Sequence, residues 1–206
     1  MSKKVAIVDY NMGNLASVKN GLLKVGADAQ IVKDGDELKN FDKILLPGVG
    51  AFKDAIVHLE KNGLKEAILE FAKSGKPLLG ICLGMQLLFN KSYEFGEHKG
   101  LGLIEGEVIP FDKTKFPHRL KIPHMGWNEL FVKKESPLFK SLPKAFYLYF
   151  VHSYHAVCDD KYAIGKTIYG YEFVSAVQKD NIFGLQPHPE KSHENGLTIL
   201  KNFMEI

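Results

Sequence analysis

The sequence lacks the features that mark several specialised classes of protein. Only two of its 206 residues are cysteine, Cys82 and Cys158, which is too few for a secreted disulfide scaffold, and neither belongs to a metal-binding CxxC pair. No apolar run approaches the roughly 20 residues that a membrane-spanning helix needs. The opening segment, MSKKVAIVDY, has no small-residue cleavage site. We therefore expect a cytoplasmic protein with no membrane segment.

Charge of one sign is also scarce. The formal net charge is only +3, and the lysines are scattered rather than gathered into a basic run or a basic stripe interleaved with aromatic residues. Nucleic acid is therefore not an expected partner. The composition, 45% hydrophobic and 25% charged, is typical of a globular protein, and no linker, repeat or low-complexity segment interrupts it. Residues 1–206 are predicted to form a single domain.

Short apolar runs alternate with helical patterns in the first half of the chain. Val5–Val8, Ile44–Leu46 and Pro77–Ile81 have the length and composition of strands that are buried on both faces. Each run is followed by a turn and then by apolar residues at helical spacing. Strands that alternate with helices in this way predict βαβ units with right-handed crossovers and a parallel sheet.

The second half of the chain has a different pattern, with short β-branched and aromatic segments between turns. Predicted strands are Glu107–Phe111, Phe146–Val151, Phe173–Gln178 and Ile182–Gln186, the last two joined as a hairpin. A helical pattern closes the chain from Gly196 onward. The predicted fold class is α/β, with a mostly parallel sheet and additional antiparallel strands in the C-terminal half.

The strongest local signal is Gly80-Ile81-Cys82-Leu83-Gly84, which places a thiol between a buried strand and a helix predicted over Leu83–Phe89. Glycine two positions to either side is the nucleophile-elbow pattern, with cysteine in place of serine. The helix N-terminus favours a thiolate, and the free amide of Leu83 is placed to bind an oxyanion. A lone cysteine is usually a small buried hydrophobe, but this context favours a nucleophile. Cys158 has no such context and is predicted to be structural.

A cysteine nucleophile needs a base, and His188 is the best candidate among the eight histidines. It lies in Gln186-Pro187-His188-Pro189-Glu190, directly after a predicted strand, where prolines stiffen the backbone. If the segment is extended, Glu190 shares a face with His188 and orients its imidazole. Cys82, His188 and Glu190 then match the roles of a hydrolase triad. On its own, a histidine between prolines is more often an ordinary loop residue.

A glycine-rich turn, Pro47-Gly48-Val49-Gly50, follows the second buried strand. Turns at the carboxyl ends of parallel strands line the edge where open α/β sheets bind ligands, so the amides of Val49 and Gly50 are candidates to complete the oxyanion hole. The composition fits a simple tight turn equally well. Because the GxGxxG and GxxxxGK spacings of phosphate sites are absent, we expect no nucleotide site, cofactor or metal.

Six stretches spread over nearly the whole chain carry a resemblance to a known family. They are Asp9-Tyr10-Asn11-Met12-Gly13-Asn14, Pro47-Gly48-Val49-Gly50-Ala51-Phe52, residues 80–89, Pro123-His124-Met125-Gly126-Trp127-Asn128, Tyr149-Phe150-Val151-His152-Ser153-Tyr154, and His188-Pro189-Glu190-Lys191-Ser192. The chain resembles the class I glutamine amidotransferases, and within them the glutaminase subunits of imidazole glycerol phosphate synthase.

The resemblance implies a flavodoxin-like sheet, with helices on both faces, and a glutaminase triad of Cys82, His188 and Glu190. It also implies a set of residues that hold L-glutamine by side chain or backbone: Gln86, Glu94, His152, Ser153 and Tyr154, together with Gly50. A carboxylate suits the substrate ammonium, and a fixed amide suits its carboxylate or carboxamide. Without the resemblance, Glu94 would be interpreted as a solvated helix-end acid and Gln86 as a partly buried polar residue.

The resemblance implies a partner as well. Ammonia released into water would be protonated and lost, and the family docks this subunit on a (β/α)8-barrel cyclase that receives the ammonia. The heterodimer makes imidazole glycerol phosphate and aminoimidazole carboxamide ribonucleotide in histidine biosynthesis. Asn11, Asn14, Trp127 and Lys191 fall at positions that the family uses near the interface, although Trp127 fits a core aromatic equally well.

Other interpretations remain open. A paralogue that supplies ammonia to a sugar-modifying enzyme with a barrel partner would carry the same glutaminase motifs. A non-catalytic binding subunit is disfavoured by the intact triad, and a hydrolase or peptidase of other amides by Gln86 and the glycine-rich turn. One departure from the family is Pro187, which stands where an aromatic residue is common. It removes an amide donor beside His188.

Overall fold

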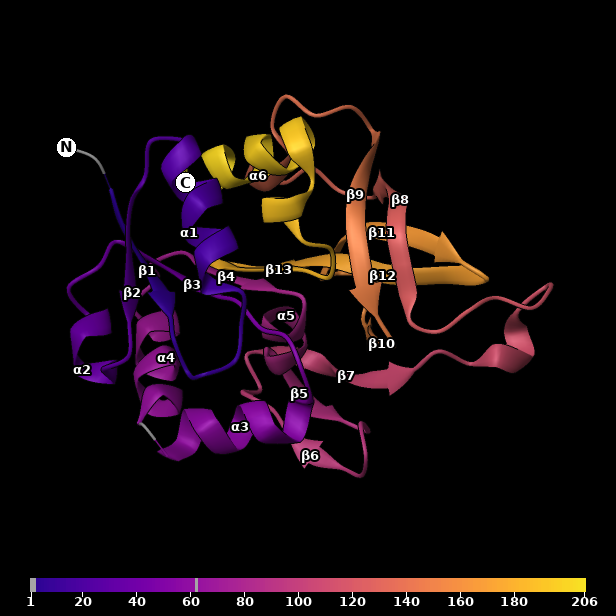
Figure 1. The fold of residues 1–206 in the computed structure, drawn as a ribbon, viewed down its shortest axis with the longest axis horizontal. Helices are drawn as coiled ribbons and strands as arrows, with labels where there is room; N and C mark the ends of the chain where they lie inside the picture. The colour runs from indigo at the N-terminus through magenta and orange to yellow at the C-terminus, as the bar shows by residue number, and fades with distance from the viewer. Residues whose placement is uncertain (1–2, 62) are drawn as a thin grey trace.

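The computed structural model describes residues 3–61 and 63–206 and shows an α/β molecule built on one large sheet (Figure 1). The strands are β1 (Lys4–Val8), β2 (Asp28–Val32), β3 (Lys43–Leu46), β4 (Leu78–Ile81), β5 (Phe89–Ser92), β6 (His98–Lys99), β7 (Ile104–Pro110), β8 (His124–Val132), β9 (Ala145–His152), β10 (Tyr154–Cys158), β11 (Ala163–Tyr169), β12 (Tyr171–Lys179) and β13 (Ile182–Leu185). The helices are α1 (Leu15–Lys24), α2 (Gly35–Leu38), α3 (Phe52–Lys61), α4 (Leu64–Lys73), α5 (Leu83–Leu87) and α6 (His193–Glu205), with 3-10 turns η1 (Lys113–Lys115), η2 (Pro137–Phe139) and η3 (Pro189–Lys191).

Five parallel strands form the part of the sheet that positions the elbow. They run in the order β2-β1-β3-β4-β13, and each neighbouring pair is parallel. This is the flavodoxin-like strand order, in which ligands bind beyond the carboxyl ends of the strands. Cys82 lies directly after β4 and Gln186 directly after β13, at that same edge.

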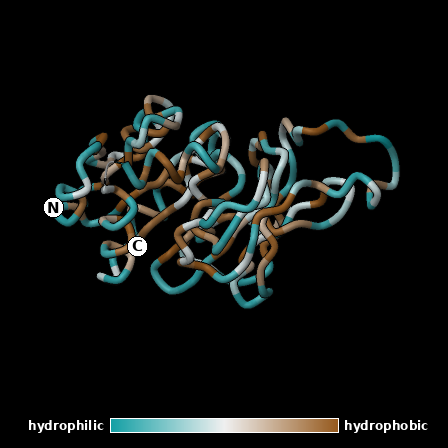
Figure 2. Tube along the Cα trace, turned by 90° about the horizontal axis from the view of Figure 1, so that it is seen from below, coloured by the Kyte–Doolittle hydropathy of each residue, from teal (hydrophilic) through white to brown (hydrophobic). Residues whose placement is uncertain are grey.

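Alternate residues of the buried strands pack under helices on opposite faces of the sheet. Val5 and Ile7 of β1 share a core with residues of α1 and α6, whereas Ala6 and Val8 share one with residues of α3, α4 and α5. Figure 1 shows α1 and α6 above the sheet, and α3, α4 and α5 below it. The hydrophobic segments accordingly run through the middle of the molecule, and hydrophilic ones form most of the outer loops (Figure 2). The predicted arrangement of helices on both faces is confirmed.

The antiparallel strands predicted for the C-terminal half are also confirmed. β12 pairs with β13 in the predicted hairpin, and β10, β7, β11, β8 and β9 extend this part of the sheet. One helix boundary differs from the prediction of Leu83–Phe89, because α5 ends at Leu87 and Phe89 begins β5. The carbonyls of Leu87 and Leu88 accept hydrogen bonds from Leu101 and Leu103, so a distant segment ends the helix.

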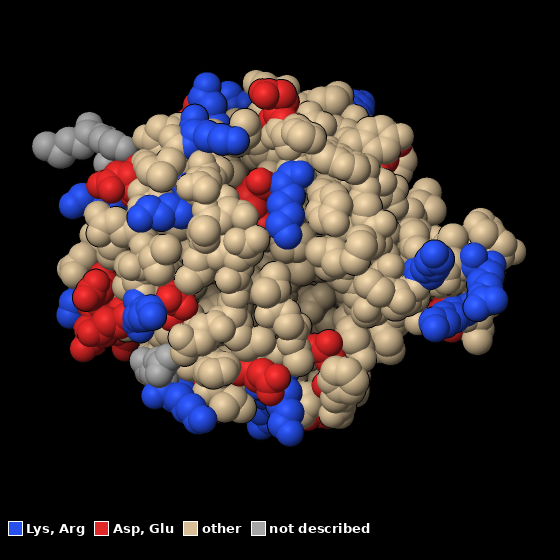
Figure 3. Space-filling model, viewed as in Figure 1, with Lys and Arg blue, Asp and Glu red and all other residues tan. Residues whose placement is uncertain are grey.

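A segment of residues 111–123 projects from the antiparallel part, between β7 and β8 (Figure 1). Figure 3 shows Lys and Arg side chains gathered on this projection, while basic and acidic groups are mixed over most of the remaining visible face. Phe116 of this segment packs where Gly170, at φ +75°, has no side chain to obstruct it. In residues 3–61 and 63–206, no helix has both the length and the hydropathy to cross a membrane.

Candidate active site

The elbow at Cys82 has the geometry that its glycines predict. Cys82 has φ +54°, a conformation that L residues rarely adopt, and its amide donates to Leu185 O at 2.7 Å across the β4–β13 pair. A Cβ on Gly80 would lie 2.6 Å from Gly84 O, and one on Gly84 would overlap the Leu46 carbonyl. Both glycines therefore let α5 begin directly against the strand ends. This places the Cys82 sulfur at the N-terminus of α5, beside the Leu83 amide.

His188 and Glu190 form a buried pair immediately after β13. His188 Nδ1 lies 2.7 Å from Glu190 Oε1, and the two side chains are only 3% and 1% exposed. In the described part of the chain, His188 Nε2 has no regular hydrogen-bond partner, which leaves it available to the Cys82 sulfur. Burial lowers the pKa of His188, but hydrogen bonding and charge from Cys82 and Glu190 outweigh burial and raise this pKa from 6.5 to about 10. The site thus favours the charged imidazolium form of His188 beside Cys82.

Cys82 and His188 open onto a pocket of about 300 Å³, large enough for a small amino acid. Its lining contains the sequence-predicted nucleophile, base, oxyanion and substrate residues, with Glu190 behind His188. The lining residues are Val49, Gly50, Cys82, Leu83, Gln86, Glu94, Pro123, Val151, His152, Ser153, Tyr154 and His188. Pro123 and Val151 are the two that sequence reasoning did not assign to the site, although each lies in a stretch that carries the family resemblance.

The glycine-rich turn lies against the elbow. A Cβ on Gly48 would lie 2.9 Å from Leu83 Cβ, so glycine is required for this approach. Tyr10 donates its hydroxyl proton to Pro47 O at 2.7 Å, which ties the start of the turn to the segment that follows β1. Beyond that anchor, Val49 is 40% exposed and Gly50 has φ +103°. Within residues 3–61 and 63–206, neither of these two amides makes a hydrogen bond, so the peptide is free to turn toward the sulfur.

Two polar side chains of the pocket are Gln86, which belongs to α5, and Glu94, which follows β5. Glu94 Oε2 accepts from the Phe52 amide at 2.6 Å at the start of α3, and burial raises the pKa of Glu94 although this hydrogen bond opposes the rise. Gln86 is 6% exposed and uses its Nε2 to donate to Tyr154 O and to Gln186 Oε1. Its side-chain carbonyl is the group left for a substrate.

His152 lines the pocket, but its ring does not offer a free nitrogen there. Nδ1 lies 2.8 Å from Tyr154 O, and Nε2 lies 2.9 Å from Nδ1 of His124. Burial lowers the pKa of His152, and burial lowers that of His124 to about 4. Both ring nitrogens of His152 are therefore engaged within the protein. His124, which pairs with His152 between β8 and β9, was not assigned a role from sequence.

The buried His124 should make the fold sensitive to acid. Its folded pKa of about 4 lies below the ordinary 6.5, so the unfolded chain binds the proton more strongly. The associated stability is present above pH 6.5 and is lost as the pH falls through about 4, by up to about 3 kcal/mol. When the free energy of unfolding is measured with urea between pH 7 and pH 4, it should therefore fall less steeply toward acid pH in His124→Asn than in the unaltered chain. The same substitution at exposed His118 is the control, and an equal flattening there would contradict this account.

The four residues predicted near a partner interface are on the surface. Trp127 is 46% exposed and stacks on His193 with ring centroids 5.0 Å apart, so it is not a core aromatic. Lys191 is exposed in η3, with Nζ 6.0 Å from the centre of the Tyr149 ring. Asn14 caps α1, which packs against η3, and Asn11 is exposed just before it. Of these elements, α1 packs directly against η3, which contains Glu190.

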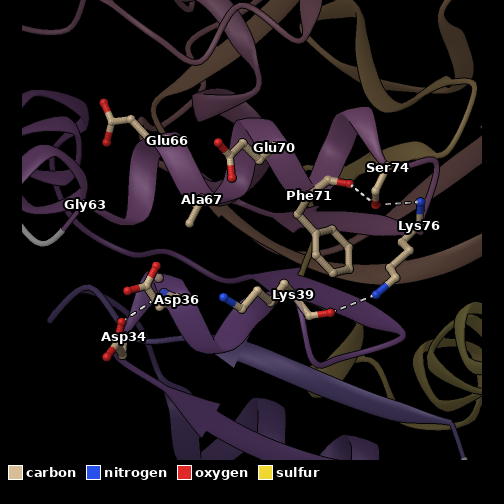
Figure 4. A pocket seen from close by; sticks show the side chains of 11 residues that line it. Asp34, Asp36, Lys39, Gly63, Glu66, Ala67, Glu70, Phe71, Ser74 and Lys76 are labelled. Atoms are coloured by element: carbon tan, nitrogen blue, oxygen red, sulfur yellow. Dashed lines mark hydrogen bonds between the residues drawn. The ribbon is translucent and has the colours of Figure 1, made fainter.

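Other parts of the structure lack comparable chemistry. Burial raises the pKa of the Cys158 thiol to about 11, so this cysteine is a poor nucleophile. A hollow of about 520 Å³ between α2 and α4 is lined by Asp34, Asp36, Glu66 and Glu70 (Figure 4) and shares no residue with the Cys82 pocket. In the described ranges, no group of three or more His, Cys, Asp or Glu side chains could hold a metal ion.

Known proteins with related sequences decide the family. Residues 6–206 match the family model described as glutamine amidotransferase class-I. A protein of Wolinella succinogenes, "Imidazole glycerol phosphate synthase subunit HisH", is 65% identical over 203 residues, which cover 98% of this chain and 99% of that protein. A protein of the same name from Sulfurimonas denitrificans is 64% identical over 200 residues, which cover 97% of this chain and 96% of that protein.

The chain belongs to the class-I glutamine amidotransferases, in the HisH subunit family. The family assignment agrees with the fold. The structure titled "Structure of PurLQS from Thermotoga maritima" matches with a TM-score of 0.78, covering 100% of this chain and 99% of that one at 21% sequence identity. At that identity the likeness concerns the fold alone. In this HisH-family glutamine amidotransferase, the elbow cysteine, the buried His–Glu pair and the small pocket together form the candidate active site.

Proposed function

We propose that the chain is the glutaminase subunit of an imidazole glycerol phosphate synthase and hydrolyses L-glutamine to glutamate and ammonia. The observation that carries the proposal is that Cys82 and His188 open onto the same pocket, of about 300 Å³. The names of the HisH relatives support the assignment to this synthase rather than to a sugar-modifying paralogue. A cytoplasmic location accords with this proposal.

The proposed reaction begins with Cys82 as a thiolate and His188 as an imidazolium. The sulfur attacks the side-chain carboxamide carbon, and the resulting oxyanion is bound by the amides of Leu83 and of the Val49–Gly50 turn. His188 then gives its proton to the leaving nitrogen, so ammonia departs and a thioester forms. The neutral imidazole next removes a proton from water, which attacks the thioester and releases glutamate. Glu190 holds the ring by its contact with Nδ1 throughout.

The pocket offers complementary groups for the amino-acid end of glutamine. Glu94 is the only carboxylate among the lining residues, and it suits the substrate ammonium. Because the Gln86 Nε2 is already engaged, we propose that its carbonyl oxygen accepts from the substrate. Backbone groups of His152, Ser153 and Tyr154 complete the wall, and Gly50 leaves room beside the turn. No metal or cofactor takes part in the proposed chemistry.

The ammonia needs a protected route to its acceptor. We propose that a (β/α)8-barrel cyclase docks over the surface of Asn11, Asn14, Trp127 and Lys191, forms a heterodimer with this chain and receives the ammonia. The cyclase then makes imidazole glycerol phosphate and aminoimidazole carboxamide ribonucleotide for histidine biosynthesis. Copurification of the native partner, followed by an assay with glutamine and the histidine-pathway nucleotide, tests the acceptor. Product formation is expected, and transfer of ammonia to a sugar substrate instead would establish the paralogue.

The free Val49–Gly50 peptide predicts a weak enzyme in isolation. If this peptide must turn before the oxyanion hole is complete, the isolated chain lacks one donor, which costs about 10²- to 10³-fold in turnover. We expect glutamine hydrolysis to rise by that factor when the cyclase and its nucleotide are added. Equal rates with and without them would refute the reorientation.

A pair of glycine variants localises this effect. Gly50→Ala adds a side chain at φ +103° and should lower the activated rate, whereas Gly26→Ala adds one at φ +79° in open space, away from the site. If both variants lose the same fraction of the activated rate, backbone strain in general, rather than the turn, is responsible.

A further inference from the structure

The side chain of Gln186, which follows β13, contacts the sulfur of Cys82. Gln186 is 0% exposed, and its Nε2 lies 3.7 Å from Cys82 Sγ, within hydrogen-bond range for sulfur. Its backbone amide donates to Ser175 O at 2.9 Å, and the preceding Leu185 pairs with Ile81 in β4. The sheet therefore holds Gln186 and Cys82 side by side at neighbouring strand ends.

The orientation of the Gln186 amide is determined by Gln86. Gln86 Nε2 lies 3.1 Å from Tyr154 O, and a carbonyl can only accept a hydrogen bond. This identifies the Gln86 atom as the nitrogen, which also faces Gln186 at 3.0 Å. The Gln186 atom at that contact must then be its oxygen. Its nitrogen, with two hydrogens, is the atom turned toward the sulfur.

A second chain of hydrogen bonds ends at Tyr154 O, which accepts from His152 as well as from Gln86. It starts on β8 at Asn128, whose Nδ2 donates to Ile168 O at 2.9 Å while its Oδ1 accepts from the Glu129 amide at 2.8 Å. These two contacts settle which Asn128 atom is nitrogen. Nδ2 also lies 3.1 Å from His124 Nε2, so this ring nitrogen is an acceptor and the ring proton is on Nδ1.

The donor-to-acceptor direction set by Asn128 continues through His124 and His152 to the pocket. His124 Nδ1 donates to His152 Nε2 at 2.9 Å, so His152 carries its proton on Nδ1 and donates to Tyr154 O at 2.8 Å. The lowered pKa values of both rings, caused first by burial, agree with these neutral forms. Tyr154 O thus receives hydrogen bonds from two buried side chains and anchors Gln86. The donors and acceptors assigned along both chains of hydrogen bonds are therefore mutually consistent, and they leave the Gln186 nitrogen facing Cys82.

We propose that Gln186 donates a hydrogen bond to the Cys82 thiolate and thereby favours the anionic, attacking form of the sulfur. The neutral thiol has a competing contact, since Cys82 Sγ lies 3.8 Å from Val151 O and can donate to it. Once ionised, the sulfur can only accept, and Gln186 Nε2 supplies a fixed donor in addition to the imidazolium of His188. The inference rests on the proposed function only in taking Cys82 as the nucleophile.

The pH dependence of Cys82 alkylation in the full 206-residue chain tests this role. Iodoacetamide reacts with the thiolate, and peptide mass spectrometry separates Cys82 from Cys158, which serves as an internal reference. Gln186→Glu keeps an oxygen for Gln86 to donate to but replaces the donor facing the sulfur. Loss of a hydrogen bond to a charged group should raise the midpoint of Cys82 alkylation by about one pH unit and slow the reaction about tenfold near neutral pH.

A second variant separates the missing donor from the added charge. Gln186→Leu removes the donor without adding a carboxylate, and a smaller shift in the same direction is expected. Because it leaves a Gln86 N–H without its acceptor, its thermal midpoint should be measured first; if it does not fold, Gln186→Glu decides alone. An unchanged alkylation midpoint in a folded variant overturns the proposal. Alkylation needs neither glutamine nor the cyclase, so this test stands even if the chain fails to hydrolyse glutamine.

Discussion

Replacing Cys82 with alanine should abolish glutamine-dependent product formation while the ammonia-dependent reaction of the complex survives. The substitution removes the sulfur that forms the thioester, and loss of a triad nucleophile costs on the order of 10⁴-fold or more. Alanine is smaller than cysteine and leaves the fold of the elbow intact, so docking on the cyclase should persist. Rates with glutamine and with ammonium chloride, measured on the same complex, give the two activities.

Cys158→Ala is the matched control for this experiment. Cys158 is partly buried outside the pocket, and its thiol pKa is raised to about 11 by burial, so both activities should remain. Loss of both activities in Cys82→Ala would show that Cys82 is structural, and retention of glutamine hydrolysis would remove it from the mechanism.

Glu190→Gln should lower glutamine hydrolysis by on the order of 10³-fold or more without removing the nucleophile. The carboxylate at 2.7 Å fixes the Nδ1 proton of His188 and, together with Cys82, raises the pKa of this histidine. A neutral amide stabilises the imidazolium less, so the pKa of His188 should fall. The pH profile of kcat/KM should accordingly lose activity on its alkaline side at a lower pH than in the unaltered enzyme.

The contrast with a nearby acid isolates the effect of Glu190. Glu194→Gln changes an exposed carboxylate in the first turn of α6 and should leave both the rate and the profile unchanged. A Glu190→Gln variant that loses rate but keeps the alkaline limb in place would mean that Glu190 acts by orienting the His188 ring and not through its pKa.

The parts of the fold that were predictable are those with strong local patterns. The continuous apolar runs of β1, β3 and β4 predict buried strands directly from the sequence. The hairpin and the elbow are likewise predicted by their turn residues and glycines. β2 was missed because only Ala29 and Val32 of Asp28–Val32 are buried at the sheet edge, which gives no continuous apolar run. β8 was missed for a similar reason, since His124–Val132 has polar and half-buried residues along most of its length.

The site was predictable where chemistry follows local spacing or the family resemblance. Cys82 and His188 do open onto one pocket, with Glu190 behind the histidine. Contacts between distant side chains were not visible in the pattern: Gln86 and Gln186 are 100 residues apart, and His124 meets His152 through the register of β8 and β9. The ring of His152 was accordingly given no separate structural role. Pro187 lies beyond the last paired residue of β13, so it interrupts no ladder, and the His188 amide still donates to Tyr149 O at 2.9 Å.

The most direct test of the account is covalent labelling of the full chain with an electrophilic diazoketone analogue of glutamine, followed by peptide mass spectrometry. A sulfur activated by His188 inside a glutamine-shaped pocket should carry the label at Cys82, with protection by excess L-glutamine and no label at Cys158. Labelling that ignores L-glutamine, or that marks Cys158 as readily as Cys82, would contradict the existence of a glutamine site at this cysteine.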